Sequence, residues 1–279
     1  MNTISAYLFD NKKQAKEALW FQKALWLFLL YKCYVYSTHF NKLFSEQSFI
    51  YSKQASIGTL KDGAYFLTNH YSVWLSMMVI AIVAIVSLYG LLNRHYILTN
   101  IVLWFCVLNL NNYLYSTLTA GDHLLNQLLF FSIFLNTKNT STIFSNDLKK
   151  VLHNMAFIGV KIQICLVYVM AALFKLQDVD WLHGDALLYI AQIPEYSNSF
   201  FSSLPSFSYT IMTYAVMFYQ LTFPLVVFYF PFKKYIIAFG IIQHLAIAFC
   251  MGLFSFGVIM IICYIPFLKY DVVRNRQLT

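Results

Sequence analysis

HYSVWLSMMVIAIVAIVSLYGLL, residues 70–92, is the most continuous apolar stretch of the chain. It carries no Asp, Glu, Lys or Arg, and Arg94 and His95 follow it closely. A helix needs about 20 mainly apolar residues to cross the hydrocarbon core of a bilayer. The stretch therefore predicts a transmembrane helix.

Seven further apolar segments accompany this one. They are residues 18–38, 96–116, 123–136, 155–176, 209–230, 235–251 and 253–268. Of the 279 residues, 60% are hydrophobic and 11% are charged, whereas a soluble domain carries about a quarter charged residues. We therefore expect an all-α integral membrane protein with about eight transmembrane helices. Segment 123–136 is short, which leaves open whether it crosses the membrane fully.

The apolar segments predict one transmembrane bundle over residues 18–268, between a polar lead-in at 1–17 and a tail at 269–279. The lead-in has lysines but no apolar core before a small-residue cleavage site, so it is not a cleaved signal peptide. In the first segment, Lys23 and Lys32 each lie within about two turns of one end. We expect both ammonium groups to extend to the membrane interface.

The lysines and arginines gather at the ends of alternate segments. With the N-terminus inside, the inner side holds Lys12, Lys13, Lys16, Arg94, Lys138, Lys149, Lys150, Lys233, Lys234, Lys269, Arg274 and Arg276, and the outer side holds Lys42, Lys53, Lys61 and Lys175. Because Lys and Arg accumulate in cytoplasmic loops, we expect both termini in the cytoplasm. No basic run with interleaved aromatics accompanies the net charge of +8, so we expect no nucleic-acid partner.

Several known chemistries leave no sign in the sequence. There is no phosphate-binding glycine loop, no GxSxG elbow, no HExxH and no dinucleotide-binding glycine pattern. The five cysteines lie inside apolar stretches without a CxxC pair, which favours buried thiols over disulfides or a thiolate metal site.

The densest group of ionisable residues lies in YVMAALFKLQDVDWLHGDALLY, residues 168–189. Lys175 ends an apolar helix, and Asp178, Asp180, His183 and Asp185 follow. One interpretation is an interfacial salt-bridge cluster around Lys175. The other is a desolvated lysine that acts as a base.

Lys161, Tyr168 and Lys175 are seven residues apart and share one stripe of the helix over 155–176. A charge at membrane depth normally faces the bundle interior or a watery cavity. The alternative for Lys161 is that its side chain reaches the inner interface.

His244 lies near the middle of segment 235–251. It fits either a hydrogen bond between helices or a proton relay or cofactor contact. Asn109, Asn112 and Ser116 share one helical face by their spacing of three and four residues.

Asp122 follows Gly121 in a turn, so it is expected to cap the next helix. An ion site formed by Asp122 and His123 is the alternative, but no fixed ligand spacing supports a metal.

Three motifs together resemble the HTTM family, the horizontally transferred transmembrane domain shared with the membrane half of vitamin K-dependent gamma-carboxylase. They are Lys175-Leu176 with the later Trp181 and Gly184, NNYLYSTLTAGDHLLNQLLFF (111–131), and GIIQHLAIAFCMGLFSFGVIMIICYIPFL (240–268). The resemblance covers most of the chain from about residue 70 onward.

The resemblance implies a bacterial inner (plasma) membrane protein with an outward-facing pocket built by the third, fifth and seventh segments. It implies Lys175 as the base, His244 as a second catalytic residue, and Asn112, Tyr168 and Trp181 at a quinone-like or lipid-like molecule. Reduced quinone is the cofactor that the family suggests, and no metal is expected.

The sequence also departs from the carboxylase. The spacing from Lys175 to Trp181 is one residue longer, no histidine occurs near Asn111 and Asn112, and the large extracytoplasmic domain is not expected here. Glutamate carboxylation by this chain alone is therefore not expected. Short SdpB-like bacterial members, which help to mature a secreted peptide toxin, suggest a role in peptide maturation. The alternative is a non-enzymatic membrane partner or scaffold for an exported peptide.

Overall fold

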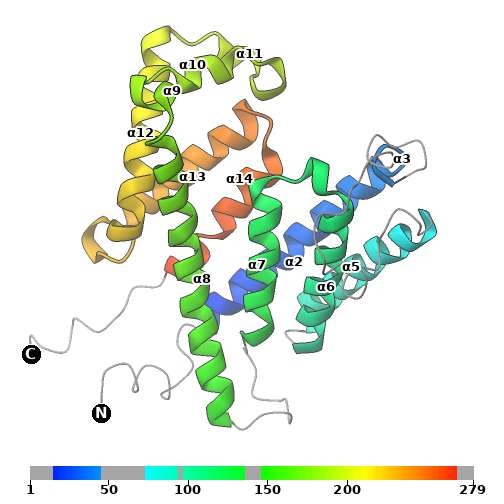
Figure 1. Ribbon diagram of the computed structural model, residues 1–279. Coiled ribbons are helices and arrows are strands. Elements are labelled where there is room, and N and C mark those ends of the chain that lie inside the picture. Colours follow the sequence, from blue (N-terminus) through cyan, green and yellow to red (C-terminus); the bar gives the residue numbers. More distant parts are fainter. Residues whose placement is uncertain (1–14, 45–72, 94–96, 136–145, 269–279) are drawn as a thin grey trace, which may run out of the picture. The chain divides into compact units, whose positions relative to one another are not determined.

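The computed structural model describes residues 15–44, 73–93, 97–135 and 146–268. Over these ranges the chain forms helices and connecting turns without a strand, which confirms the prediction of an all-α fold (Figure 1). Most of the predicted lead-in and the whole predicted tail lie outside the described residues.

Each of the eight predicted apolar segments contains a helix. These helices are α2 (Ala15–Thr38), α5 (Val73–Asn93), α6 (Ile97–Tyr113), α7 (Ala120–Phe134), α8 (Asn146–Lys175), α12 (Ser206–Val226), α13 (Phe230–Cys250) and α14 (Phe254–Ile262). The shorter elements are α3 (Phe40–Phe44), η1 (Tyr115–Thr117), α9 (Val179–His183), α10 (Ala186–Ala191), η2 (Pro194–Tyr196), α11 (Ser199–Ser202) and η3 (Ile265–Phe267).

In the part of the chain that the structure describes, three helical stretches are long and apolar enough to cross a membrane. They are Val73–Leu92, Asp147–Lys175 and Pro231–Cys250. The apolar stretches Ile97–Tyr113 and Phe254–Phe267 are shorter. These three stretches indicate a membrane protein. The number of eight crossings and the side of each terminus remain predictions.

Helices α8 and α14 differ most in length from the predicted segments. α8 begins at Asn146, nine residues before the predicted segment 155–176. Asp147 in its first turn suits the positive end of the helix dipole and pairs with Lys150 at 3.3 Å, which explains the earlier start. α14 ends at Ile262, before Pro266, so it is shorter than the predicted segment 253–268.

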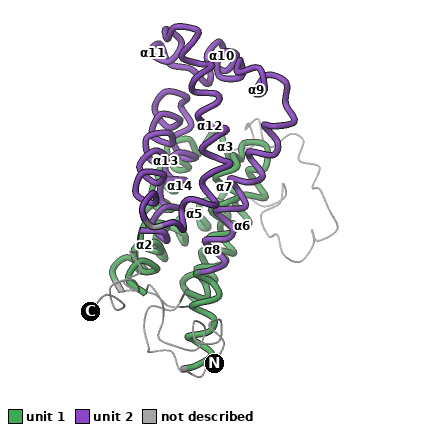
Figure 2. The backbone as a smooth tube through the Cα atoms, turned by 90° about the vertical axis from the view of Figure 1, so that its left-hand side faces the viewer, with its two compact units in different colours: residues 1–157 green, residues 158–279 purple. Residues whose placement is uncertain are grey.

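The described chain falls into two compact units, residues 1–157 and 158–279 (Figure 2). Helix α8 contributes its first part to unit 1 and the remainder to unit 2. Each unit is described by itself, so the single bundle over 18–268 stays a prediction.

In unit 1, α2 packs against α5 and α7, and α6 packs against α5 and α7. A buried polar network joins these helices: Trp26 Nε1 donates to Asn100 Oδ1 at 3.0 Å, and Asn100 Nδ2 donates to the carbonyl oxygen of Ser132 at 2.8 Å. Gln22 Nε2 also donates to that carbonyl, at 3.1 Å. Polar bonds of this kind hold helices together where the surroundings are apolar.

In unit 2, α13 packs against α12 and α14, and α10 packs against α12. The short helices α9, α10 and α11 connect the end of α8 to the start of α12. Together with the start of α12 they form a small core of Leu187, Ala191, Phe201 and Tyr209.

Candidate functional site

A chain of hydrogen-bonded side chains crosses the interior of unit 2. His244 Nε2 on α13 lies 3.0 Å from Tyr168 Oη on α8. Tyr168 Oη lies 2.6 Å from Tyr264 Oη, which in turn lies 2.7 Å from Tyr219 Oη on α12. All four residues are at most 2% exposed. We call these four residues the tyrosine–histidine chain.

Aromatic rings enclose the tyrosine–histidine chain. The ring of Phe223 lies 4.3 Å from that of Tyr168 between centroids, and the ring of Phe256 lies 5.9 Å from that of His244. In such apolar surroundings a hydrogen bond is electrostatically stronger than in water, and an unpaired polar atom is costly.

Two glycines create the space for this arrangement. A Cβ on Gly240 would overlap the hydroxyl oxygens of both Tyr219 and Tyr264. A Cβ on Gly257 would lie 2.5 Å from the carbonyl oxygen of His244. Gly240 thus lets the hydroxyl groups approach the backbone of α13, and Gly257 lets α14 pack closely on the same helix.

The other ring nitrogen of His244 behaves differently. Nδ1 is buried and has no hydrogen-bond partner among the described residues. Each tyrosine hydroxyl carries one proton and donates at most one bond of the chain, so the bonds can run in one direction throughout, either toward His244 or away from it. If they run toward His244, Nε2 accepts and Nδ1 carries the proton; if they run away, Nε2 donates and Nδ1 is an acceptor.

Lys175, the predicted base, lies at the end of α8. Its Nζ is 4.5 Å from the centre of the Trp181 ring, within the range of a cation–π contact. Of the predicted salt-bridge partners, Asp178 instead caps α9, where its Oδ1 accepts from the backbone N–H of Asp180 at 3.0 Å and of Trp181 at 3.3 Å. Asp180 is exposed. The described residues show no ion pair to Lys175, so the predicted salt-bridge cluster is not found there.

The structure brings the predicted site residues together in two pairs. Tyr168 bonds to His244, and Lys175 contacts Trp181. Tyr168 and Lys175 are seven residues apart, which is roughly 10 Å along the helix axis. The two pairs therefore lie about two turns apart along α8. Asn112, the fifth predicted residue, is half-buried and belongs to unit 1, whereas the other four belong to unit 2.

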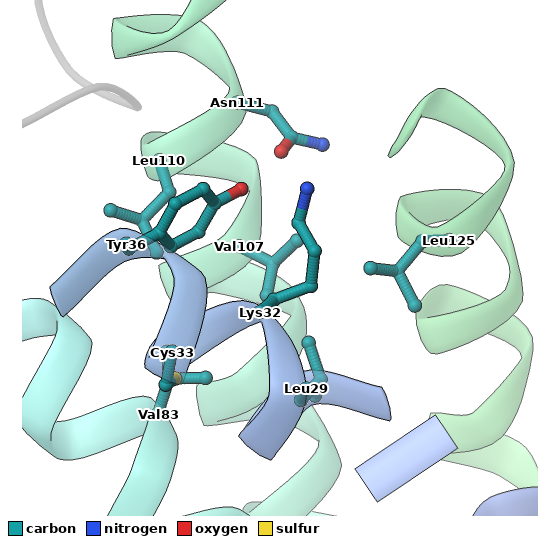
Figure 3. A pocket seen from close by; sticks show the side chains of 9 residues that line it. All are labelled: Leu29, Lys32, Cys33, Tyr36, Val83, Val107, Leu110, Asn111 and Leu125. Carbon is teal, nitrogen blue, oxygen red and sulfur yellow. The ribbon is translucent and has the colours of Figure 1, made fainter. Parts of the chain in front are cut away.

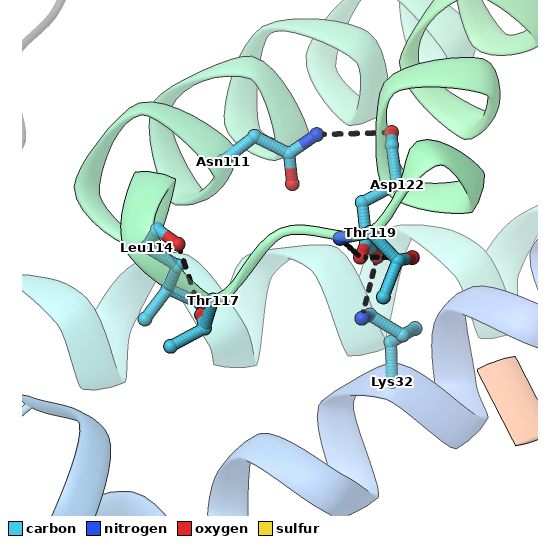
Figure 4. A network of polar contacts seen from close by, with 6 residues as sticks. All are labelled: Lys32, Asn111, Leu114, Thr117, Thr119 and Asp122. Atoms are coloured by element: carbon cyan, nitrogen blue, oxygen red, sulfur yellow. Dashed lines mark hydrogen bonds and ion pairs between the residues drawn. The ribbon is translucent and has the colours of Figure 1, made fainter. Parts of the chain in front are cut away.

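Unit 1 holds a second buried polar group, which sequence reasoning missed. Lys32 Nζ lies 2.7 Å from Asp122 Oδ1, and the two side chains are 11% and 5% exposed. The predicted extension of Lys32 to the interface is therefore wrong. The Lys32 ammonium group pairs with Asp122 in place of reaching the interface, because the Asp122 carboxylate faces α2 (Figure 4).

The start of α7 fixes the position of Asp122. Its Oδ2 accepts from the backbone N–H of Thr119 at 2.9 Å and from the Thr119 hydroxyl at 2.8 Å. Asn111 Nδ2 donates to the Asp122 carbonyl oxygen at 3.1 Å. Asp122 thus takes part in capping α7, but from the third position of the helix, in a capping box whose N-cap is Thr119. Its neighbour His123 is exposed, and the described residues contain no group of three His, Cys, Asp or Glu side chains that could hold a metal ion.

A small cavity lies beside this ion pair. Leu29, Lys32, Cys33, Tyr36, Val83, Val107, Leu110, Asn111 and Leu125 line it (Figure 3). The polar tips of Lys32, Tyr36 and Asn111 face one another at one end, and the Lys32 Nζ lies 4.9 Å from the centre of the Tyr36 ring. The mainly apolar wall favours a structural role for the ion pair.

The sequence analysis did not single out Tyr219 and Tyr264, nor the pairing of Lys32 with Asp122. The chain has 21 tyrosines, and nothing local distinguishes these two. The pairing of Lys32 with Asp122 spans 90 residues and leaves no periodic signal. Gly240, four residues before His244, and Gly257 were the available signs of close packing at the tyrosine–histidine chain.

Comparison with known proteins gave no match for this chain: no family model fits it, and neither the curated proteins nor the solved structures include a similar one.

Proposed function

We propose that the chain is a multi-pass membrane protein of HTTM type whose second unit binds a quinone-like or lipid-like molecule at the tyrosine–histidine chain. It would cross the bacterial inner membrane about eight times, with both termini in the cytoplasm. The observation that carries the proposal is the hydrogen-bonded series from Tyr219 to His244, buried among aromatic rings.

The behaviour of His244 Nδ1 favours a quinone-like ligand in particular. A quinone oxygen accepts a hydrogen bond, whereas the hydroxyl of the reduced form donates one. Because Nδ1 is a donor when the bonds run one way and an acceptor when they run the other, the same site suits both forms. A lipid ester carbonyl would use one of these directions alone.

Lys175 is proposed as the base of a carboxylase-like or peptide-maturation reaction. Its freedom from a carboxylate among the described residues supports this role, since a paired lysine would hold its proton more tightly. A ligand that reaches from the Tyr168–His244 pair to the Lys175–Trp181 pair would follow α8 between backbone positions roughly 10 Å apart along its axis. A quinone ring with a prenyl tail, or a lipid, has this length.

Purification in detergent, followed by mass spectrometry of extracted quinones and lipids, tests the binding. Tyr168→Phe should lose the molecule that the wild type retains. Tyr209→Phe is the matched control, because its buried hydroxyl also donates one hydrogen bond, to the carbonyl oxygen of Phe201, but lies outside the chain. Equal retention by both variants, or no molecule in the wild type, would refute the proposal.

A second candidate is a non-enzymatic membrane partner for an exported peptide. The observation that favours it is the position of Lys175, which is half-exposed against Trp181. Lys175→Ala separates the two candidates. Retained ligand with lost peptide maturation supports a base, whereas unchanged maturation supports the scaffold.

A further inference from the structure

The connection between α8 and α12, residues 176–205, has apolar side chains on its outside as well as in its core. Its core residues Leu187, Ala191 and Phe201 are at most 8% exposed. Its outside carries six large side chains that are 41–65% exposed: Val179, Leu182, Tyr189, Ile193, Tyr196 and Phe200. We refer to residues 176–205 as the cap segment.

Short helices in water normally place polar residues opposite their core. The cap segment exposes large apolar side chains beside its polar ones, and exposed apolar groups of this kind mark a surface that contacts something else. Its charged residues are four acids, Asp178, Asp180, Asp185 and Glu195, and it contains no Lys or Arg.

The backbone of the cap segment lies level with the ends of two predicted spans. Asn198, the N-cap of α11, donates two hydrogen bonds to the last residues of α13. Its backbone N–H donates to the carbonyl oxygen of Cys250 at 3.0 Å, and its Nδ2 donates to the carbonyl oxygen of Phe249 at 3.1 Å. Cys250 ends the candidate span of α13, and Lys175, directly before the cap segment, ends that of α8. The ends of spanning helices mark the boundary between hydrocarbon and headgroups.

We infer that the cap segment lies in the membrane interface and inserts its exposed apolar side chains into one leaflet of the bilayer. Tyrosine and tryptophan are enriched at this depth, where one end of the ring is apolar and the other is wet. Tyr189, Tyr196 and Trp181 fit that level, and the four acids remain on the aqueous side. This inference rests on the membrane placement proposed above, and not on the proposed ligand.

Depth-dependent fluorescence quenching tests the inference. Phe200→Trp and Tyr196→Trp replace exposed rings, and Asp180→Trp is the matched control at an exposed acid of the same segment. Each full-length variant is reconstituted into vesicles of phosphatidylcholine and phosphatidylglycerol that contain lipids brominated either near the headgroup or near the chain end. Subtracting the wild-type emission isolates the added tryptophan.

Lipids brominated near the headgroup should quench the tryptophan fluorescence at positions 200 and 196 at least roughly twofold more than that at position 180. At positions 200 and 196, these lipids should also quench more than lipids brominated near the chain end. Acrylamide in the water should show the opposite order. Equal quenching at all three positions by both reagents would overturn the inference.

Photocrosslinking distinguishes the bilayer from a protein partner. With p-benzoylphenylalanine at position 200, irradiation in native membranes should give a lipid adduct that mass spectrometry detects. A protein or peptide adduct in its place would overturn the inference. Ligand retention in Tyr168→Phe tests the proposed ligand site, whereas quenching and crosslinking test the placement of the cap segment. Either proposal can therefore fail without affecting the other.

Discussion

The ammonium nitrogen of Lys32 lies 2.7 Å from Oδ1 of Asp122, and 90 residues of chain separate the two. Both side chains are largely buried, at 11% and 5% exposure. Burial makes the pair sensitive to the loss of either partner, because the remaining charge would be desolvated without compensation.

Replacing Lys32 by Met should therefore destabilise unit 1, by about 3–5 kcal/mol on the scale of broken buried pairs. The measurement is thermal unfolding in detergent, followed by circular dichroism. Lys150→Met provides the matched control, because Lys150 pairs with an exposed Asp147 at 3.3 Å and should shift the midpoint little. Equal shifts for the two variants would argue against a buried charge at Asp122.

The pH dependence of stability should also report on Asp122. Burial would raise the pKa of this carboxyl, but the charge of Lys32 and the hydrogen bonds from Lys32 and Thr119 outweigh burial and hold the pKa below its usual value of 3.8. The folded pKa is thus below the unfolded one. The stabilisation is present above the unfolded pKa and is lost as pH falls through the folded value.

We expect the thermal unfolding midpoint of the wild type to decrease as the pH is lowered below about 4. Asp122→Asn should start from a lower midpoint and lack this part of the decline. Parallel curves for the two proteins would assign the acid transition to other carboxyls.

Gly240→Ala should disrupt the tyrosine–histidine chain, because the added methyl group overlaps the hydroxyl oxygens of Tyr219 and Tyr264. Overpacking of a tight interior costs about 1–3 kcal/mol. Combining Gly240→Ala with Tyr219→Phe and Tyr264→Phe should recover part of that loss, and thermal unfolding of all combinations measures it. Strictly additive effects would mean that the methyl group is accommodated without meeting the hydroxyls.

Gly184→Ala should destabilise unit 2 more than Gly252→Ala does. Both glycines have left-handed backbone conformations, with φ of 86° and 68°, and either substitution should cost about 1–2 kcal/mol. At Gly184 a Cβ would also lie 2.8 Å from Thr210 Cγ2, whereas at Gly252 the nearest atom is 3.9 Å away. The difference in unfolding midpoint isolates the steric part, and a larger loss at Gly252 would contradict it.

The sequence predicted the positions of the long helices well, because apolar runs and flanking charges are local signals. The same applies to Asp122, whose place after Gly121 indicated a cap. The partner of Asp122 could not be predicted in this way. Lys32 looked like a lysine within reach of the interface, and its actual partner depends on how α2 packs against α7.

The candidate site divides along the same line. Tyr168 and His244 stood out as polar residues in apolar segments, and the structure joins them. Tyr219 and Tyr264 complete the series through contacts 45 residues apart in sequence, which no periodicity reveals. The short helices of the cap segment also went unpredicted, because stretches of four to six residues carry too little pattern.

Gly240 finally offers a way to recognise the tyrosine–histidine chain where no structure is at hand. A protein that keeps both Tyr219 and Tyr264 has no room for any side chain at position 240. In a set of diverged relatives, glycine at 240 and the pair of tyrosines should therefore be inherited or lost together. A glycine four residues before a histidine, together with the two tyrosines, would serve as a fingerprint for the tyrosine–histidine chain.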